Sequence, residues 1–243
     1  MVEPGNVAQP AAPLRVRLLR SDLWIRVASG AVLAGVALAV TWIGGPVFDI
    51  FWIAAGILIF WEWKKIVASA RFRFLWIAGG VAYGFLAAAP PIMLRHSYDF
   101  GLIAILFLFG VVWATDIGGY VAGRIIGGPK IWPAVSPKKT WAGSLGGIVA
   151  AVIAGSLVSI GAGLGVAHAA LLSAGLSVAA QGGDFLESAI KRRFGVKDAG
   201  RIIPGHGGVM DRLDGFLVAA AAAAALGLAH GGWINPGRGL LVW

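Results

Sequence analysis

The sequence predicts an all-α, polytopic integral membrane protein with about seven transmembrane helices. Its 243 residues are 58% hydrophobic and only 13% charged, and the mean hydropathy is +0.83. A soluble domain carries about 25% charged residues. The apolar runs are long and continuous, as in membrane helices, rather than alternating as in barrel strands. The composition therefore excludes an ordinary soluble domain and favours a helical bundle in lipid.

Seven apolar segments could span the membrane. They cover residues 24–44, 47–61, 74–94, 101–113, 143–164, 167–183 and 216–233. Several are shorter than the ~20 residues that a perpendicular span needs. We expect the fourth to continue through Thr115, Asp116 and Gly119. The seventh contains a run of alanines from Ala219 to Ala225, which is weakly apolar but strongly helical.

The basic residues indicate an orientation for these spans. With the N-terminus in the cytoplasm, all of the 20 Lys and Arg residues except Arg95 and Arg238 fall in inner segments. Positive charge gathers on the cytoplasmic side of membrane proteins. We therefore expect a cytoplasmic N-terminus and an external C-terminus. The same asymmetry accounts for most of the net charge of +9, so no nucleic-acid partner is expected.

Two inner loops hold most of the polar chemistry. We divide the chain into a cytoplasmic tail at 1–23, N-terminal spans at 24–114, and a region at 115–243 with cytoplasmic loops at 115–142 and 188–213. Lipid is a poor solvent for charge, so dense polar segments beside it indicate a function. The second loop interleaves basic residues with aspartates. That mixture suits a phosphate-rich ligand held by side-chain cations and metal.

Three aspartates are the candidate metal ligands: Asp184, Asp211 and Asp214. Asp211 and Asp214 are three residues apart at the entry to the seventh span, so on a helix they share one face. A carboxylate at membrane depth costs at least ~2.5–3.5 kcal/mol and usually faces a cavity or a partner. Oxygen ligands without His or Cys suit one or two Mg²⁺ ions bridged to phosphates, and a monovalent cation is a further candidate. The alternative is simple ion pairing with nearby Lys and Arg, which for Glu187 is an equally good interpretation.

The basic residues of the second loop are candidate phosphate contacts. They include Lys191, Arg192, Lys197 and Arg212. A plain anchor against anionic headgroups would also be basic. An anchor has no use for the interleaved acids such as Asp198, however, whereas a magnesium-phosphate site needs both signs.

A glycine turn and the first loop supply the remaining candidates. Residues 204–208 read Pro-Gly-His-Gly-Gly, and glycine lets main-chain N–H groups converge on an anion. His206 could donate to a phosphate or act as an acid, and a purely structural role is equally open. The other candidate substrate contacts are Asp116, Arg124, Ser136, Lys138, Lys139, Thr140, Ser188, Gly207 and Gly208.

These residues resemble the phosphatidate cytidylyltransferase family, also called CDP-diacylglycerol synthases. The resemblance covers about residues 115–215, including an upstream G-D-x-x-E-S at 183–188. The family's closing motif is S-x-x-K-R-x4-K-D-x5-P-G-H-G-G-x-x-D-R-x-D. It is matched here by Ser188, Lys191, Arg192, Lys197, Asp198, Pro204, Gly205, His206, Gly207, Gly208, Asp211, Arg212 and Asp214.

The resemblance implies transfer of CMP from CTP to phosphatidate, giving CDP-diacylglycerol and pyrophosphate in phospholipid biosynthesis. It implies Mg²⁺ as the cofactor and, as catalytic residues, Asp184, Lys191, Lys197, Asp211 and Asp214. We expect CTP to arrive from the cytoplasm and phosphatidate from the inner leaflet of a bacterial inner membrane. A homodimer is also implied. The chain departs from the family at Ala142, where a glutamate is usual, and at Gly215, where serine is frequent.

Other functions compete with this interpretation. Related enzymes could transfer a cytidylyl group to another lipid or phosphorylate a polyprenol with CTP. The D-G-x-x-A-R pattern of CDP-alcohol phosphotransferases is absent. A transporter would favour acids near mid-membrane, whereas here they cluster at one face. An anionic-lipid receptor and a homologue that has lost activity through Ala142 are the non-catalytic alternatives.

Overall fold

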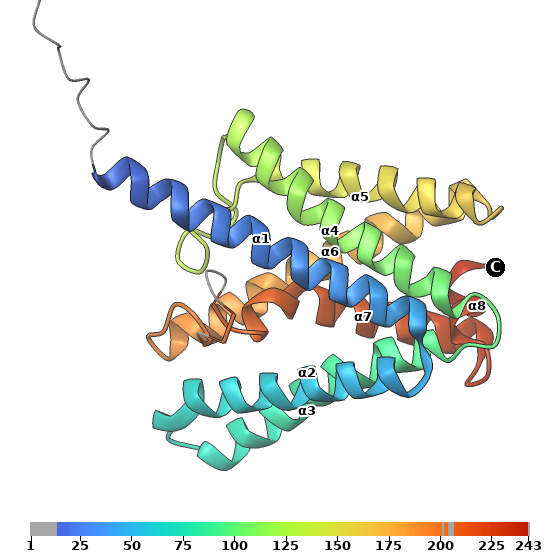
Figure 1. Ribbon diagram of the computed structural model, residues 1–243, viewed down its shortest axis with the longest axis horizontal. Helices are drawn as coiled ribbons and strands as arrows, with labels where there is room; N and C mark the ends of the chain where they lie inside the picture. The colour runs from blue at the N-terminus through green and yellow to red at the C-terminus, as the bar shows by residue number, and fades with distance from the viewer. Residues whose placement is uncertain (1–13, 201, 204–206, 243) are drawn as a thin grey trace, which may run out of the picture.

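A computed structural model describes residues 14–200, 202–203 and 207–242, with side chains from residue 27 onward. Over these ranges the chain forms helices, with two isolated bridges as its only extended pairing. The predicted all-α class is therefore confirmed (Figure 1). The helices are α1 (Leu14–Ile43), α2 (Gly45–Ile66), the 3₁₀ turn η1 (Val67–Ser69), α3 (Arg73–Arg95), α4 (Gly101–Ile125), α5 (Trp141–Gly161), α6 (Val166–Arg193), α7 (Met210–Gly231) and the short α8 (Pro236–Leu241).

Each of the seven predicted apolar segments corresponds to one long helix. By length and hydropathy, five helical segments could cross a membrane: Gly45–Ser69, Arg73–Arg95, Gly101–Ile125, Trp141–Gly161 and Met210–Gly231. Helix α1 contributes a shorter apolar stretch, Val27–Ile43. Helix α6 is not among the five, since polar residues recur along it. The chain is thus an integral membrane protein by its apolar helices.

The helices extend further into the expected loops than the apolar runs suggest. The predicted loop at 115–142 is shorter in the structure, because α4 continues to Ile125 and α5 begins at Trp141. Glycines let α4 and α5 approach closely along this stretch. A Cβ on Gly147 would lie 2.8 Å from the Thr115 carbonyl oxygen, and a Cβ on Gly143 would lie 2.8 Å from that of Gly119. Small residues allow such close approach of membrane helices.

The second predicted loop, at 188–213, is shortened in the same way. Helix α6 runs on to Arg193 and α7 begins at Met210. The first half of the basic motif is therefore helical, and the motif's last two aspartates lie on α7. Only residues between these helices form a loop.

Aromatic packing ties the N-terminal helices to the motif-bearing ones. The Trp52 ring of α2 stacks on the Phe216 ring of α7, with centroids 4.8 Å apart and an angle of 11° between planes. Phe109 of α4 lies 5.3 Å from Phe216. Such ring pairs contribute about 0.5–1.5 kcal/mol beyond their burial. These ring contacts hold α2, α4 and α7 together near the start of α7.

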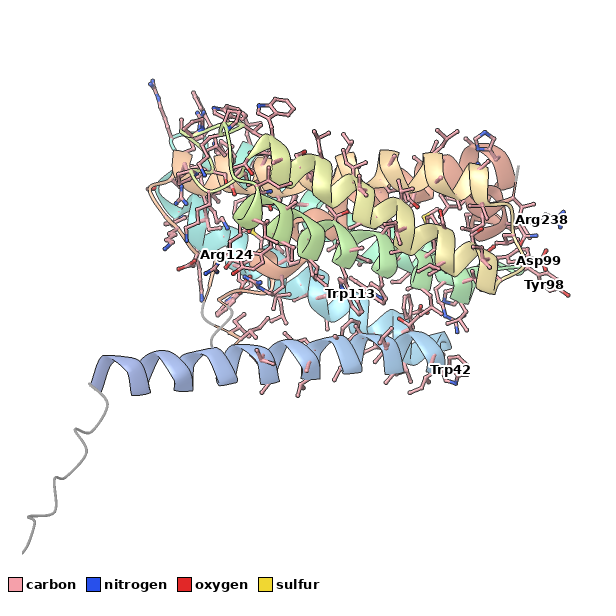
Figure 2. The ribbon with its side chains drawn as sticks, turned by 90° about the horizontal axis from the view of Figure 1, so that it is seen from above. Trp42, Tyr98, Asp99, Trp113, Arg124 and Arg238 are labelled. Atoms are coloured by element: carbon pink, nitrogen blue, oxygen red, sulfur yellow. The ribbon has the colours of Figure 1, made fainter. Side chains whose placement is uncertain are left out.

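Successive long helices alternate in direction, so both polar loops lie at one end of the bundle. The starts of α3, α5 and α7 and the ends of α2, α4 and α6 gather there (Figure 1). Figure 2 shows Arg124 at this end, with Tyr98, Asp99 and Arg238 at the opposite end. The figure also shows α1 along one side of the bundle.

Candidate active site

A cavity of about 600 Å³ opens between α4, α5, α6 and the loop before α5. Its volume is typical of small-molecule sites. Six of the predicted site residues line it: Asp116, Arg124, Lys138, Lys139, Thr140 and Asp184. The structure thus joins the first loop to Asp184 in the second half of α6, although the two lie far apart in sequence.

The cavity carries charges of both signs. Lys139 forms an ion pair with Asp184, and its Nζ also lies 4.5 Å from the centre of the Phe185 ring. Arg124 donates a hydrogen bond of 2.6 Å to the Tyr120 hydroxyl. An anionic ligand that entered here would meet cations already held in place by neighbouring side chains.

Local hydrogen bonds fix the loop that presents these lysines. The buried Thr140 accepts from the Gly143 amide at 3.1 Å and so caps the N-terminus of α5. Threonine is a favoured residue at this position because its oxygen satisfies an unpaired amide of the first turn. The Ile131 amide donates to the Lys139 carbonyl at 3.1 Å. The lysine pair is therefore anchored at the start of α5.

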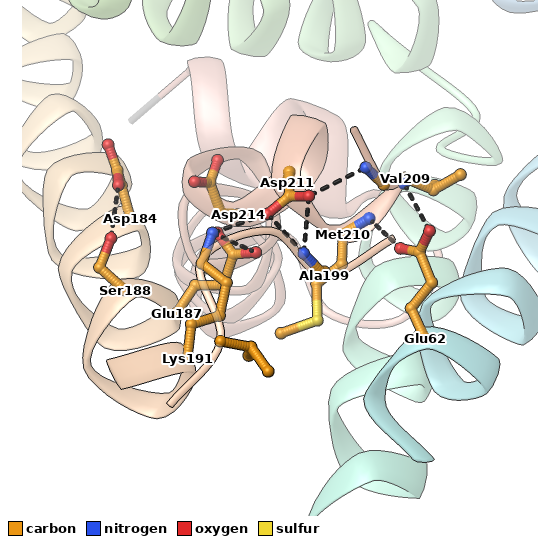
Figure 3. A network of polar contacts seen from close by, with 12 residues as sticks. Glu62, Asp184, Glu187, Ser188, Lys191, Ala199, Val209, Met210, Asp211 and Asp214 are labelled. Atoms are coloured by element: carbon orange, nitrogen blue, oxygen red, sulfur yellow. Dashed lines mark hydrogen bonds and ion pairs between the residues drawn. The ribbon is translucent and has the colours of Figure 1, made fainter. Parts of the chain in front are cut away.

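A second cluster centres on Lys191, whose side chain is 10% exposed. Its Nζ lies 2.7 Å from Asp211 Oδ1 and 3.3 Å from Glu187 Oε1 (Figure 3). The Ala199 and Gly208 amides also donate to Asp211, each at 2.9 Å to Oδ2. Asp211 therefore joins three parts of the chain: α6, the first turn of α7, and the loop between these two helices, here called the motif loop.

Beside this cluster lies a group of acids. Asp214 interacts electrostatically with Asp184, Glu187 and Asp116. Glu187 is fully buried, and neither of its carboxylate oxygens has a hydrogen-bond partner among the described residues. Lys191 provides its nearby counter-charge. Carboxyl groups gathered in a buried setting need a proton or a cation to neutralise part of their charge.

The acids fit Mg²⁺ in part. Asp184 and Asp214 are hard oxygen donors whose charges interact, and magnesium prefers such donors. Within the described ranges, however, no group of three or more His, Cys, Asp or Glu side chains is placed to hold a metal ion. Phosphate oxygens would have to complete the shell. Both oxygens of Asp211 accept hydrogen bonds from protein groups here, so its metal role stays a prediction that requires these bonds to exchange.

Other predicted residues lie outside these two clusters. Ser188 donates to Asp184 at 3.4 Å, and Gly207 adopts a φ of +87°, which favours glycine. Ser136 is half-buried but does not line the cavity. His206 lies outside the described residues. Four predicted contacts are exposed on the surface: Arg192, Lys197, Asp198 and Arg212.

Sequence reasoning missed Glu62, Ser144 and Gln181. Glu62 is 0% exposed and accepts hydrogen bonds from the Val209 and Met210 amides. Ser144 donates to Gln181 at 2.5 Å, and both line the cavity. A polar side chain within an apolar span is itself a sign of function. The predicted span at 47–61 ended one residue before Glu62, whereas the helix runs on to Ile66 and includes it.

These features define a helical membrane protein with a mixed-charge site at one end of its bundle, suited to anionic substrates. A model of the cytidylyltransferase family matches residues 77–229. The phosphatidate cytidylyltransferase of Brucella suis biovar 1 (strain 1330) is 38% identical over 250 residues, covering 83% of this chain and 92% of the relative. That of Bacillus subtilis (strain 168) is 44% identical over 128 residues, covering 52% of this chain and 48% of the relative. The chain belongs to the phosphatidate cytidylyltransferase family.

Proposed function

We propose that the protein transfers the CMP moiety of CTP to phosphatidate, giving CDP-diacylglycerol and pyrophosphate. The observation that carries this proposal is the cavity that joins Lys138 and Lys139 to Asp184 beside the acids of α7. Relatives that align with most of this chain are named phosphatidate cytidylyltransferase. Cations for two polyanions and acids for a metal are what this reaction needs.

The reaction needs positioning and charge neutralisation more than a strong base. An oxygen of the phosphatidate phosphate attacks the α-phosphorus of CTP, and the bond from that phosphorus to the bridging oxygen of pyrophosphate breaks. A phosphomonoester has a second pKa near 6 and is largely dianionic at neutral pH. The nucleophile therefore arrives without a proton to remove. Catalysis of this kind rests on electrostatics and alignment.

We assign phosphate binding and metal binding to different residues of the site. Lys138, Lys139 and Arg124 lie where they would bind phosphate oxygens, and the ion pair of Lys139 with Asp184 would open to do so. Asp184 and Asp214 would hold Mg²⁺, with Asp211 as the third ligand expected from the family motif. When bound, the metal supplies positive charge to the phosphates. Lys191 keeps Asp211 and Glu187 compensated at the base of the site.

The proposed membrane arrangement has seven spans, a cytoplasmic N-terminus and an external C-terminus. The site would then face the cytoplasm of a bacterial inner membrane, where CTP is available and phosphatidate enters from the inner leaflet. The chain contains no cysteine, so any labelling by a thiol reagent comes from the single cysteine that is introduced. An impermeant maleimide applied to intact cells should label Tyr98→Cys and leave Ser69→Cys unlabelled. The reverse pattern would overturn the orientation.

We also propose that two copies of the chain form a homodimer. Small residues in membrane helices permit close helix contact between copies, and the chain has 37 glycines. Native mass spectrometry of the detergent-purified protein tests this state directly. A single species at the mass of one chain across detergents would contradict it.

Turnover of labelled CTP tests the activity. Detergent-purified protein is incubated with phosphatidate, Mg²⁺ and labelled CTP, and wild type is compared with Asp211→Asn. We expect lipid-soluble CDP-diacylglycerol from wild type and a large loss in the variant. Folded wild type that binds CTP without turnover, across several lipids and divalent ions, would support a homologue inactivated at Ala142 instead.

A further inference from the structure

Glu62 is a carboxylate of the N-terminal half that reaches the motif-bearing helix. It lies near the end of α2, is 0% exposed, and accepts hydrogen bonds from the Val209 amide at 3.1 Å and the Met210 amide at 2.8 Å. Figure 3 shows its side chain pointing at the start of α7, on the side away from Lys191. It does not line the cavity that we assign to substrates.

Helix α7 has no cap of its own, and Glu62 provides one. The residue at the N-cap position is Val209, whose side chain makes no capping hydrogen bond. The first amides of a helix need acceptors, and valine is among the poorest residues at this position. A buried carboxylate at the positive end of the helix dipole satisfies both requirements. The cap comes from 147 residues away in the sequence.

The motif loop is shaped around this carboxylate. A Cβ on Gly208 would lie 2.6 Å from Glu62 Oε1 and 2.7 Å from Oε2, and one on Gly200 would also overlap Oε1. Real Cβ atoms essentially never approach that closely. A larger residue at either position would push the Glu62 carboxylate out of its present place. The Gly208 amide in turn donates to Asp211, so the space taken by Glu62 adjoins a proposed metal ligand.

We propose that Glu62 is a positioning residue for the cytidylyl-transfer reaction. By capping α7 it sets where that helix begins and how it is rotated, and so where Asp211 and Asp214 stand relative to Lys191. It touches no substrate and acts through the backbone of residues 208–210. This inference rests on the proposed function, because it assigns the consequence of misplacement to that reaction.

Glu62→Gln is the most informative variant. Its volume is nearly unchanged, but one of the two acceptor oxygens becomes a donor that faces a backbone N–H. Misplacement of catalytic groups by about 1 Å costs on the order of 100-fold in rate, so we expect kcat to fall roughly 10- to 100-fold with KM for CTP little changed. Amide hydrogen exchange over residues 207–213 should rise, with exchange elsewhere in the bundle unchanged. Asp49→Asn is the matched control, since it makes the same chemical change on α2 at the opposite end, where Asp49 contacts His96.

A second pair of variants tests the same idea without altering Glu62. Gly200→Ala should displace the Glu62 carboxylate and reproduce both the loss of kcat and the faster exchange. Gly175→Ala is its control, because a Cβ there meets nothing within 4 Å. Wild-type kcat in Glu62→Gln would overturn the proposal. So would a loss of activity with unchanged exchange at 207–213, or faster exchange throughout the bundle, which would mark a general structural role.

The two readouts separate this inference from the proposed function. If wild type makes no CDP-diacylglycerol, the proposed function fails. The exchange measurement needs no substrate and still decides whether Glu62 holds the start of α7. Local exchange that rises in Glu62→Gln and Gly200→Ala, but in neither control, supports the positioning role.

Discussion

Replacing Lys191 by glutamine should damage both stability and activity. Its side chain is 10% exposed, and its Nζ lies 2.7 Å from Asp211 and 3.3 Å from Glu187, whose side chains are 6% and 0% exposed. Removing one partner of a buried ion pair costs about 3–5 kcal/mol, because a buried charge is left uncompensated. Here Asp211 is the charge that loses its cation, and Glu187 loses its contact with the same Nζ.

The loss of activity depends on how much of this free energy also stabilises the transition state. If about 3 kcal/mol is lost there, kcat falls roughly 100-fold, since each ~1.4 kcal/mol is a factor of ten. Initial rates of CDP-diacylglycerol formation at saturating substrates measure this loss, and the thermal midpoint in detergent measures the stability. Lys64→Gln is the matched control, an exposed lysine that undergoes the same change of charge. Wild-type kcat and thermal midpoint in Lys191→Gln would refute the reasoning.

Three further variants probe other parts of the site. Thr140→Val removes the cap of α5, whose hydrogen bond to Gly143 is 3.1 Å long; we expect a loss of about 1 kcal/mol in unfolding free energy, read from a lower thermal midpoint. Gly147→Val should break the contact of α5 with α4, because its Cβ would lie 2.8 Å from the Thr115 carbonyl oxygen; poor recovery of folded protein is the readout, and a well-folded variant would contradict the packing. Asp184→Asn should lower kcat and raise the Mg²⁺ concentration needed for half-maximal rate, whereas an unchanged Mg²⁺ dependence would remove Asp184 from the metal site.

The sequence predicted the helices well because lipid imposes a simple rule on them. A span must be apolar and about 20 residues long, so the apolar runs mark the long helices. Their ends were less predictable. Helix α4 continues beyond the expected Gly119 to Ile125. There Gly123 packs closely against Thr140 and Gly143 at the start of α5, and that contact depends on three-dimensional packing rather than on hydropathy.

The motif indicated the site's chemistry but not its internal contacts. Lys191 and Asp211 were both predicted, and the structure places them 2.7 Å apart. The motif treats them as separate functional residues, whereas the structure makes them one ion pair. Glu62 could not be found from the motif, because a bond between positions 147 residues apart leaves no local pattern. Its charge lay one residue beyond the predicted span at 47–61, so hydropathy did not mark it either.

The fate of differently labelled CTP tests the central claim most directly. Purified protein, phosphatidate and Mg²⁺ are supplied in parallel with CTP labelled at the α-phosphate and CTP labelled at the γ-phosphate. Cytidylyl transfer predicts that the α-label enters the lipid and the γ-label leaves in pyrophosphate. A lipid labelled from the γ-phosphate with release of CDP would identify a kinase, and neither label in the lipid would contradict an enzymatic role with this substrate.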